Sequence, residues 1–583
     1  MDHITVRHIV EAVSGTLLCG DADTELKHIS IDSRSMRGAD LFVPLIGEKS
    51  DAHRFLVQAM DNGAAAALTS EHEAAPEGFH GALIQVKDTK LALQTIGRCL
   101  RAHLSIPLVG ITGSVGKTTT REMVAAALSA KYKTFKTPAN HNSQIGVPLT
   151  ISEISENDEI GVLELGMSEP GEMAVIAEIA AVDSAVMTNI GVTHIENLGS
   201  RENILKEKLH IQDGMKAGGI LFVNGDNDML STVHAKAGCH TVRYGLGADN
   251  DYRAEDLSYP DGFPSFTMVH GEVRVPVKLT VMGEHNVMNA LAALAVADAY
   301  GVPLADAAEK LLEFGGFKNR QQIYHKNDYT IVDDTYNASP DSMKAAIGVL
   351  SSLPAGRRIA VLADMKELGE NTIQFHREVG AFLAEKPVDI LVVYGELAQA
   401  IAEGAKKVKP DLHIVSFEED EKEDMLDWLD AQIGEGDAVL FKGSNSMKLG
   451  ETAARFISVE KTPTSDRMLE QIFYLLRADP LQFLIESSDR QPHHIRVRTV
   501  DSADMRGKAS LNAVCARLVH RLAAVYIRLD LRIAHRIYIH PRLNRKAALP
   551  ILSQDRHARV YTVAAPLDPS DHLKRLIPIR RFS

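Results

Sequence analysis

The residues best suited to chemistry form one short segment of the chain. Val109 to Thr120 reads V-G-I-T-G-S-V-G-K-T-T-T. Gly113 and Gly116 would let backbone N–H groups converge on phosphate oxygens, and a helix starting after them would add positive potential. Lys117 could reach the β- and γ-phosphates, and the Thr118 hydroxyl could ligate Mg²⁺. The pattern therefore predicts a loop that binds nucleotide phosphates.

This segment departs from the general phosphate-loop pattern at one position. The pattern G-x-x-x-x-G-K-[ST] requires Gly at 111, where this chain has Ile111, so the loop is of the tighter T-G-x-x-G-K-T type. The alternative is a chance glycine-rich turn before a surface helix. We favour the phosphate loop because a strand-like apolar run precedes it, from Pro107 to Thr112, and helical apolar spacing follows.

Two polar residues follow further apolar runs. Glu164 lies in I-G-V-L-E-L-G-M, and His194 lies in T-N-I-G-V-T-H-I-E-N-L-G-S. Because parallel sheets bind ligands at the carboxyl ends of their strands, we interpret Glu164 as a Mg²⁺ ligand rather than an ordinary strand-end acid. For His194, a metal or phosphate role and a simple satisfied polar residue stay equally open.

Three residues sit in helical patterns. Lys208 lies in the stretch Asn203–Ile211, and the pattern alone predicts a solvent-exposed lysine. Asn286 and Asn289 lie in the first turn of the Ala/Leu-rich segment G-E-H-N-V-M-N-A-L-A-A-L. They could hydrogen-bond a base or ribose, or simply cap the helix.

The remaining candidates lie beyond residue 318. Arg320 stands at a candidate domain junction, from which it could move onto phosphates as the domains close. Asp333, Asp334 and Asn337 follow another apolar strand, so they too are expected at the carboxyl edge of a sheet.

The elements that must position these residues alternate between strands and helices, which predicts an α/β fold with parallel sheets. The first series of strand candidates comprises residues 108–112, 160–165, 185–190 and 219–223. A second, smaller doubly wound series comprises residues 329–333, 358–363, 390–394 and 438–441. We expect an α/β N-terminal domain at 1–106, a central domain at 107–318, a Rossmann-like domain at 319–460 and an extension at 461–583.

Composition excludes several classes of protein. The chain has no run of 18 apolar residues and no basic-then-apolar N-terminus, so neither membrane insertion nor secretion is predicted, and a cytoplasmic protein is expected. Its four cysteines are far apart and lack metal-ligand spacing. The chain carries 77 Asp and Glu against 63 Lys and Arg, which argues against general nucleic-acid binding.

The last 123 residues differ in kind from the rest. Residues 461–583 hold 22 Lys and Arg, 18 of them Arg, against 11 Asp and Glu. One interpretation is a basic arm that binds nucleic acid or a membrane surface. The interpretation we favour is a sequence not selected to fold, from frame-shifted or read-through translation.

Several segments together resemble the Mur ligases, the ATP-dependent amide-forming enzymes of peptidoglycan precursor synthesis. They are the phosphate loop, L-E-L-G-M, T-N-I-G-V-T-H-I-E-N-L-G-S, G-E-H-N-V-M-N-A-L-A-A, D-D-T-Y-N-A-S-P-D-S-M-K-A-A and L-A-D-M-K-E-L-G. The last two are similar to the branch that joins D-alanyl-D-alanine to UDP-N-acetylmuramoyl-tripeptide. The resemblance runs from about residue 3 to 457.

The resemblance implies three domains, which bind the UDP end of the substrate, ATP with two Mg²⁺, and the incoming amine, respectively. It implies phosphate contacts from Thr112, Gly113, Ser114, Val115, Gly116, Lys117 and Thr118. It implies Mg²⁺ ligands at Thr118, Glu164, His194 and a carbamylated Lys208, with Lys117, Lys208 and His194 as catalytic groups. It implies ATP contacts at Asn289, Arg320 and Asp334, and substrate contacts at Ser33, Arg34 and Asn337.

Three departures from the family pattern touch no catalytic group. His210 stands where an acidic residue is common, Ala52 replaces a usual Gly, and Ser143 replaces a usual Asn. Two other readings remain: another Mur or folylpolyglutamate-type ligase, and a P-loop nucleotide switch, although the guanine-reading N-K-x-D is missing from this sequence. We expect a monomer that binds no nucleic acid.

Overall fold

The computed structural model describes residues 3–48, 50–326, 328–458, 483–488 and 491–499. Residues Met1–Glu460 form one compact unit and Lys461–Ser583 a second. In the second unit the described backbone is an antiparallel pair of strands, β23 (Phe483–Ser488) and β24 (Gln491–Thr499). The prediction for the rest of the basic extension falls outside the described residues.

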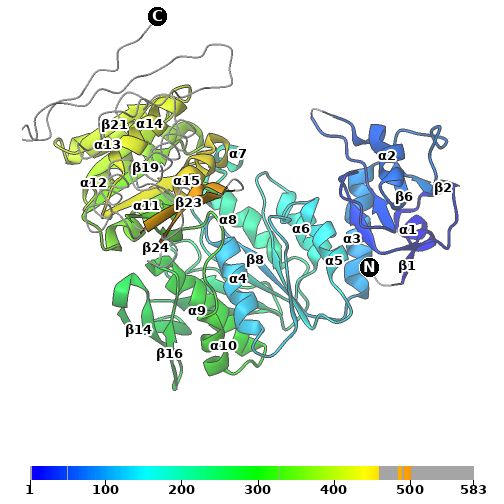
Figure 1. The fold of residues 1–583 in the computed structure, drawn as a ribbon. Helices are drawn as coiled ribbons and strands as arrows, with labels where there is room; N and C mark the ends of the chain where they lie inside the picture. The colour runs from blue at the N-terminus through cyan, green and yellow to red at the C-terminus, as the bar shows by residue number, and fades with distance from the viewer. Residues whose placement is uncertain (1–2, 49, 327, 459–482, 489–490, 500–583) are drawn as a thin grey trace, which may run out of the picture. The chain divides into compact units, whose positions relative to one another are not determined.

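The first part of the larger unit is built on a five-stranded sheet in the order β2-β7-β6-β5-β4 (Figure 1). Its strands are β2 (Thr16–Cys19), β4 (His28–Ser30), β5 (Asp40–Phe42), β6 (Ala64–Thr69) and β7 (Ala82–Gln85), and a separate pair joins β1 (Ile4–Thr5) to β3 (Glu25–Leu26). The helices are α1 (Val6–Val13), η1 (Ala52–Phe55), α2 (Leu56–Asp61) and α3 (Thr89–His103). Asp88 caps α3 by accepting the N–H of Leu91.

The second part contains a nine-stranded sheet in the order β16-β15-β14-β13-β12-β11-β8-β10-β9. Its strands are β8 (Leu108–Thr112), β9 (Thr134–Lys136), β10 (Ile160–Glu164), β11 (Ser184–Met187), β12 (Ile220–Asn224), β13 (His240–Gly245), β14 (Tyr252–Ser258), β15 (Ser265–His270) and β16 (Val273–Lys278). The helices are α4 (Lys117–Leu128), α5 (Gly146–Glu153), α6 (Glu172–Ala180), α7 (Ile195–Leu198), α8 (Arg201–Leu209), η2 (His210–Gln212), η3 (Pro260–Gly262), α9 (Glu284–Ala299) and α10 (Leu304–Leu311).

The topology of this sheet explains where the site must lie. From β8 the chain runs through α4 to β9 and β10 on one side, and from β10 through α6 to β11 on the other. The carboxyl ends of β8, β10 and β11 therefore meet at a switch in strand order, where parallel sheets bind ligands. Val109 and Ile111 of β8 pack with α4 and α9, which lie side by side, whereas Leu108 joins the core on the other face (Figure 1).

The third part contains a six-stranded sheet in the order β17-β18-β22-β19-β20-β21. Its strands are β17 (Gln322–His325), β18 (Tyr329–Asp333), β19 (Arg357–Ala363), β20 (Ile390–Tyr394), β21 (His413–Phe417) and β22 (Asp437–Lys442). The helices are α11 (Pro340–Ser352), η4 (Gly369–Asn371), α12 (Thr372–Ala384), α13 (Gln399–Val408), α14 (Lys422–Gln432), η5 (Asn445–Met447) and α15 (Leu449–Ser458). Because β18, β22 and β19 are parallel neighbours, the loops that follow them share one edge.

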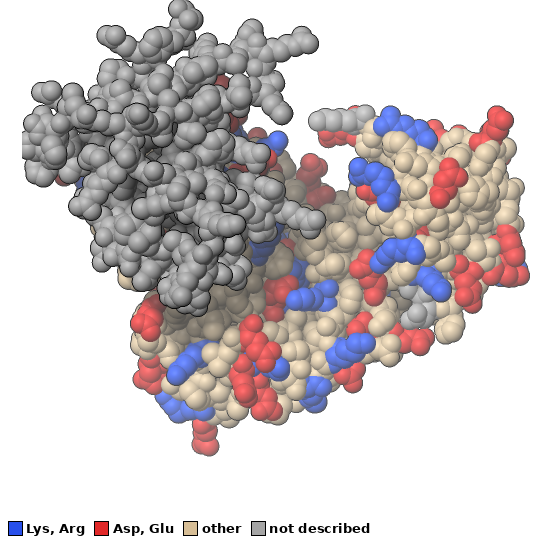
Figure 2. Space-filling model, in the orientation of Figure 1, with Lys and Arg blue, Asp and Glu red and all other residues tan. Residues whose placement is uncertain are grey.

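The α/β class and the parallel sheets are confirmed, with one correction. Strands alternating with helices in a parallel sheet are expected across the central domain, but β14, β15 and β16 form an antiparallel extension of the sheet. Figure 2 shows acidic and basic side chains interspersed over the visible face of the described residues. No helix in the described part of the chain is long and apolar enough to cross a bilayer.

Candidate nucleotide site

The predicted phosphate loop connects β8 to α4, and its two glycines are required by what surrounds them. Gly113 has φ +154°, and a Cβ there would lie 1.9 Å from Thr188 Oγ1. Gly116 has φ +88°, and a Cβ there would lie 3.2 Å from Asn289 Oδ1. A side chain at either position would displace the neighbouring loop or strain the backbone, so the close approach depends on glycine.

The loop after β11 holds the phosphate loop in place. Val115 N–H donates to Asn189 Oδ1 at 2.8 Å, and Ser114 N–H donates to the Asn189 carbonyl at 3.0 Å. In return, Gly191 N–H donates to Ser114 Oγ at 2.9 Å. Asn189 is thus a functional residue that the sequence analysis missed, although it lies five residues before His194 in a segment already singled out.

Lys117 and Thr118 occupy the first turn of α4. Lys117 Nζ donates to the carbonyls of Gly113 at 2.8 Å and Ser114 at 3.4 Å. Burial lowers the pKa of Lys117, the charge of Glu164 opposes this shift, and the charge of Arg320 adds to it. Thr118 is buried, and its hydroxyl accepts a hydrogen bond from Arg320 Nη2 at 3.2 Å. Arg320 therefore lies against the phosphate loop, and its predicted role as a phosphate contact stays a prediction.

Glu164 ends β10 and is 3% exposed. Its Oε2 accepts from Arg121 Nη1 at 3.2 Å, and its Oε1 accepts from Asn142 Nδ2 at 2.8 Å. Arg121, which is fully buried, also pairs with Glu122 at 2.6 Å. Each carboxylate oxygen of Glu164 keeps a lone pair beyond these bonds, so the residue can still ligate a cation. Arg121 was another residue missed in the sequence.

His194 precedes α7 with a left-handed backbone, φ 64°. Its Nδ1 lies 2.5 Å from Oε2 of Glu367, which belongs to the loop after β19. Burial lowers the pKa of His194, and the positive charges of Lys117 and Lys208 lower it further, against the opposing effect of Glu367. The predicted His194, Lys117 and Lys208 therefore lie near one another.

Lys208 contradicts the prediction from pattern alone. The lysine was expected to face solvent, but it is only 1% exposed in α8. Burial and the charge of Lys117 both lower its pKa well below the usual value. Among the described residues, no hydrogen bond or ion pair satisfies its amine. The helical pattern failed here because α8 has almost no apolar stripe by which a buried face could be recognised.

The asparagines of α9 are occupied within the protein. Asn289 Oδ1 accepts from Thr120 Oγ1 at 2.9 Å, and Asn289 Nδ2 donates to Asn286 Oδ1 at 3.0 Å. Asn286 in turn donates to the carbonyl of Met282 at 2.7 Å. Asn289 thus joins α9 to α4 beside the phosphate loop, and one of its amide N–H groups remains for a ligand.

The predicted residues after β18 gather around a lysine that the sequence analysis missed. Lys442, at the end of β22, is 1% exposed, and its Nζ lies 2.7 Å from Asp334 Oδ2. The same amine donates to the carbonyl of Asn337 at 2.9 Å, while the Asn337 side chain is exposed. Arg320 stacks over the ring of Tyr336, with Cζ 3.8 Å from the centroid. Because Arg320 also contacts Thr118, this cluster lies next to the phosphate loop.

Ser33 and Arg34 lie in the first part of the chain, after β4. The carbonyl of buried Ser33 accepts from Asn62 Nδ2 at 2.7 Å. The exposed Arg34 pairs with Asp32, with Nη2 2.8 Å from Oδ2, and this contact lowers the pKa of Asp32 to about 2. Their role as substrate contacts stays a prediction.

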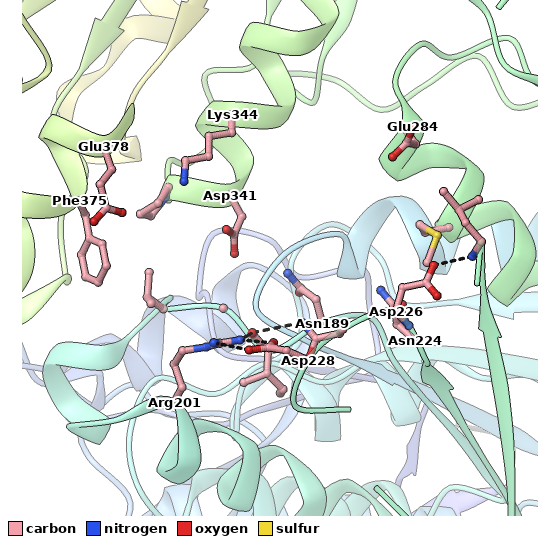
Figure 3. A pocket seen from close by; sticks show the side chains of 17 residues that line it. Asn189, Arg201, Asn224, Asp226, Asp228, Glu284, Asp341, Lys344, Phe375 and Glu378 are labelled. Atoms are coloured by element: carbon pink, nitrogen blue, oxygen red, sulfur yellow. Dashed lines mark hydrogen bonds and ion pairs between the residues drawn. The ribbon is translucent and has the colours of Figure 1, made fainter. Parts of the chain in front are cut away.

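A polar cavity of about 600 Å³ adjoins the phosphate loop through Asn189 (Figure 3). Asp341 and Lys344 of α11 lie across it from Arg201, which pairs with Asp228 at 2.6 Å. Its charged lining comprises Asp226, Asp228, Glu284, Asp341 and Glu378 against Arg201 and Lys344, and it includes none of the predicted site residues. An excess of carboxylates disfavours phosphate, so this cavity suits nucleotide phosphates less well than the glycine-rich loop does.

Comparison with known proteins agrees with this geometry. Three domain descriptions match in order: "Mur ligase family, catalytic domain" over residues 25–105, "Mur ligase middle domain" over 111–297 and "Mur ligase, glutamate ligase domain" over 319–445. The UDP-N-acetylmuramoyl-tripeptide–D-alanyl-D-alanine ligase of Bacillus subtilis is 40% identical over 459 residues, which cover 77% of this chain and 97% of that protein. The protein of the same name from Haemophilus influenzae is 33% identical, over 74% of this chain and 94% of that one.

Solved structures give the same result. MurF from Acinetobacter baumannii is 31% identical with a TM-score of 0.70, covering 78% of this chain and 98% of that one. MurF ligase from Thermotoga maritima, solved in complex with ADP, is 30% identical with a TM-score of 0.65, covering 74% of this chain and 97% of that one. Since relatives of this similarity match over nearly their whole length, and three family domains follow one another in order, the chain belongs to the Mur ligase family.

Proposed function

We propose that this chain is an ATP-dependent ligase that joins D-alanyl-D-alanine to UDP-N-acetylmuramoyl-tripeptide. The observation that carries the proposal is the contact of Arg320 with Thr118, which brings the D-D-T-Y-N-A-S-P segment to the phosphate loop. The named activity of the relatives from Bacillus subtilis and Haemophilus influenzae supports the choice of substrates. We propose that the reaction takes place in the cytoplasm, where ATP and a nucleotide-linked substrate are available.

The chemistry requires activation of a carboxylate. A carboxylate is a poor acyl donor because its negative charge repels an amine. The carboxylate oxygen of the tripeptide attacks the γ-phosphorus of ATP, the bond to the β,γ-bridging oxygen breaks, and ADP leaves. The amine of D-alanyl-D-alanine then attacks the acyl phosphate through a tetrahedral oxyanion, loses a proton and expels inorganic phosphate.

The residues at the phosphate loop suit the first step. Lys117 and the N–H groups that precede α4 place positive charge where the γ-phosphoryl group moves. Arg320, stacked on Tyr336 and hydrogen-bonded to Thr118, adds a second cation beside the loop. Packing of the two parts against each other would keep water from the acyl phosphate, which water would otherwise hydrolyse.

The side chains present fit Mg²⁺. Among the described residues, no group of three or more His, Cys, Asp and Glu side chains forms a complete cation site. Mg²⁺ is usually held by one or two carboxylates together with substrate phosphates and water, so Thr118, Glu164 and His194 are a sufficient set. When bound, the ion would neutralise charge on the phosphates during transfer.

We propose further that Lys208 is carbamylated. Its amine is buried, has no hydrogen-bond partner among the described residues and has a lowered pKa, which favours the neutral form that attacks CO₂. The nitrogen lone pair forms a bond to the carbon of CO₂, one C=O π bond opens onto oxygen, and the nitrogen loses a proton to give a carbamate anion. The modification replaces a group that would repel Mg²⁺ when protonated by an anion that supports the ion. A carbamate carbon signal in ¹³C NMR spectra of ¹³CO₂-equilibrated wild type, missing from Lys208→Ala, would test this directly.

A coupled assay of phosphate release tests the main proposal. We expect turnover only when ATP, UDP-N-acetylmuramoyl-tripeptide and D-alanyl-D-alanine are all present. Omitting each in turn separates ligation from uncoupled ATP hydrolysis. Equal phosphate release without the dipeptide would refute the ligase and favour a nucleotide switch.

A further inference from the structure

The loop after β19 contacts the segment that carries His194. Besides the 2.5 Å contact of His194 Nδ1 with Glu367 Oε2, Glu196 N–H donates to the carbonyl of Glu367 at 3.4 Å. Gly369, at φ +62°, packs so closely that a Cβ would lie 3.3 Å from the Cα of Glu196. The loop belongs to L-A-D-M-K-E-L-G, a motif used so far only to recognise the family branch.

Both partners of this contact have an unusual backbone. His194 has φ 64° and Glu367 has φ 65°, in the left-handed region that favours glycine. Neither residue is glycine, so each position keeps a side chain at the expense of backbone strain. Such backbone outliers concentrate at functional sites, where the position of the side chain matters. The strain points to a role for the side-chain contact itself.

The loop that presents Glu367 is fixed from within. Asp364 is fully buried; its carboxylate accepts the N–H of Ala398 at 2.8 Å and pairs with Lys366 Nζ at 2.7 Å. Met365 N–H donates to Nε2 of buried His376 at 3.0 Å. These bonds hold the two residues before Glu367 to the body of the third part, so the carboxylate is presented on a rigid support.

The contact determines which nitrogen of His194 carries the proton. A carboxylate accepts hydrogen bonds, so the neutral imidazole must place its proton on Nδ1 and its lone pair on Nε2. Metal-ligating histidines almost always donate their other N–H to a carboxylate or carbonyl in this way, which fixes the ring and raises its basicity. Here the carboxylate and the imidazole come from different parts of the chain.

We infer that Glu367 is a positioning residue for His194, which orients the imidazole for Mg²⁺ only when the third part of the chain packs against the second. This inference rests on the proposed function. The exposure of the Glu367 side chain argues against a purely structural role for the ion pair. Glu367 is 55% exposed in its side chain, and exposed ion pairs contribute little to stability. The effect of the pair should therefore appear in metal binding rather than in folding.

Three variants of the full chain test the inference: Glu367→Ala, Glu367→Gln and, as the matched control, Glu370→Gln. Glu370 is an exposed carboxylate three residues further along the chain, in η4. The affinity for Mn²⁺, which substitutes for Mg²⁺, is measured by electron paramagnetic resonance with a non-hydrolysable ATP analogue, so that no turnover is needed. The kcat, the KM for each substrate and the melting temperature are measured in parallel.

We expect Glu367→Ala to lose about 10- to 100-fold in Mn²⁺ affinity and in kcat, the range found for partners of metal-ligating histidines, at an unchanged melting temperature. Glu367→Gln keeps an acceptor oxygen and should lose less, and Glu370→Gln should match wild type. Mn²⁺ affinities equal across the three variants would overturn the inference, as would losses that only track a lower melting temperature. An inactive wild type would instead refute the proposed ligase, and the Mn²⁺ measurement would still decide the role of Glu367.

Discussion

Replacing Lys442 by Met should destabilise the third part of the chain through a carboxylate that it leaves behind. Lys442 Nζ is the cation nearest to Asp334, 2.7 Å from its Oδ2, and both side chains are almost fully buried. In Lys442→Met the carboxylate keeps one hydrogen bond, to Oδ1 from the N–H of Gln321 at 3.2 Å. Methionine has a similar volume, so lost charge rather than lost packing should dominate the effect.

The size of the effect follows from the carboxylate that loses its partner. Removing one member of a buried pair costs about 3–5 kcal/mol when the other stays charged. Replacing Asp334 by Asn in the same chain removes the unpaired charge, so the double variant should regain much of that free energy.

The assay uses the single tryptophan of the chain. Trp428 lies in α14, with its ring centroid 6.4 Å from that of Phe417, so its fluorescence in urea reports on the six-stranded part. We expect Lys442→Met to lose about 3–4 kcal/mol of unfolding free energy at pH 7. The double variant Lys442→Met/Asp334→Asn should recover more than half of the loss. A cost below about 1 kcal/mol, or a double variant no more stable than Lys442→Met, would refute the reasoning.

Three further predictions concern the phosphate loop, the buried lysine and the extension. Lys117→Ala should lower kcat/KM at least about 100-fold, roughly 3 kcal/mol, without loss of stability, because within the described part of the chain its amine bonds only to loop carbonyls; unchanged kcat/KM would show a structural loop. Lys208→Met should be inactive yet more stable than wild type in CO₂-free buffer. Because the pKa of Lys208 is lowered on folding, the unfolded state binds more protons, and the unfolding free energy of wild type should rise with pH up to the ordinary lysine pKa. The difference in unfolding free energy between Lys208→Met and wild type, measured in urea, should therefore shrink over that range. A difference that stays constant with pH would contradict this. A chain ending at Glu460 should keep full activity, and a folded but inactive truncation would show that residues 461–583 complete the enzyme.

The strands that sequence reasoning located best are those buried on both faces. Leu108–Thr112 and Ile390–Tyr394 are buried at every residue and have the predicted bounds, because mainly apolar runs leave little choice of register. The strands it missed are amphipathic. Val273–Lys278 has only two buried residues, both facing the same side, and such a short alternating pattern resembles a loop between helices. The antiparallel extension therefore required knowledge of which segments pair.

The residues of the candidate site also fall into two groups: those that a local sequence pattern predicts, and those that only the fold brings together. Residues named by a local pattern, such as Lys117 and Thr118, could be found because glycine, lysine and threonine lie within six positions of one another. Glu367 could not, since it contacts a histidine 173 residues earlier in the chain. Asn189 was within reach, because it follows an apolar strand at the same sheet edge as Glu164. Topology, rather than residue type, decides which strand ends meet.

The two fully buried lysines show what the structure adds about function. Lys208 and Lys442 are each 1% exposed, and burial lowers the pKa of both. Lys442 has a carboxylate and a carbonyl within 2.9 Å, so its charge is balanced inside the protein. Lys208 has no such hydrogen-bonded acceptor among the described residues; the charge of Lys117 lowers its pKa, and the charge of Glu207 opposes that shift. Burying an amine without a hydrogen-bonded partner is costly, so Lys442 is explained by the fold, whereas Lys208 is the one whose burial points to a proposed role in chemistry.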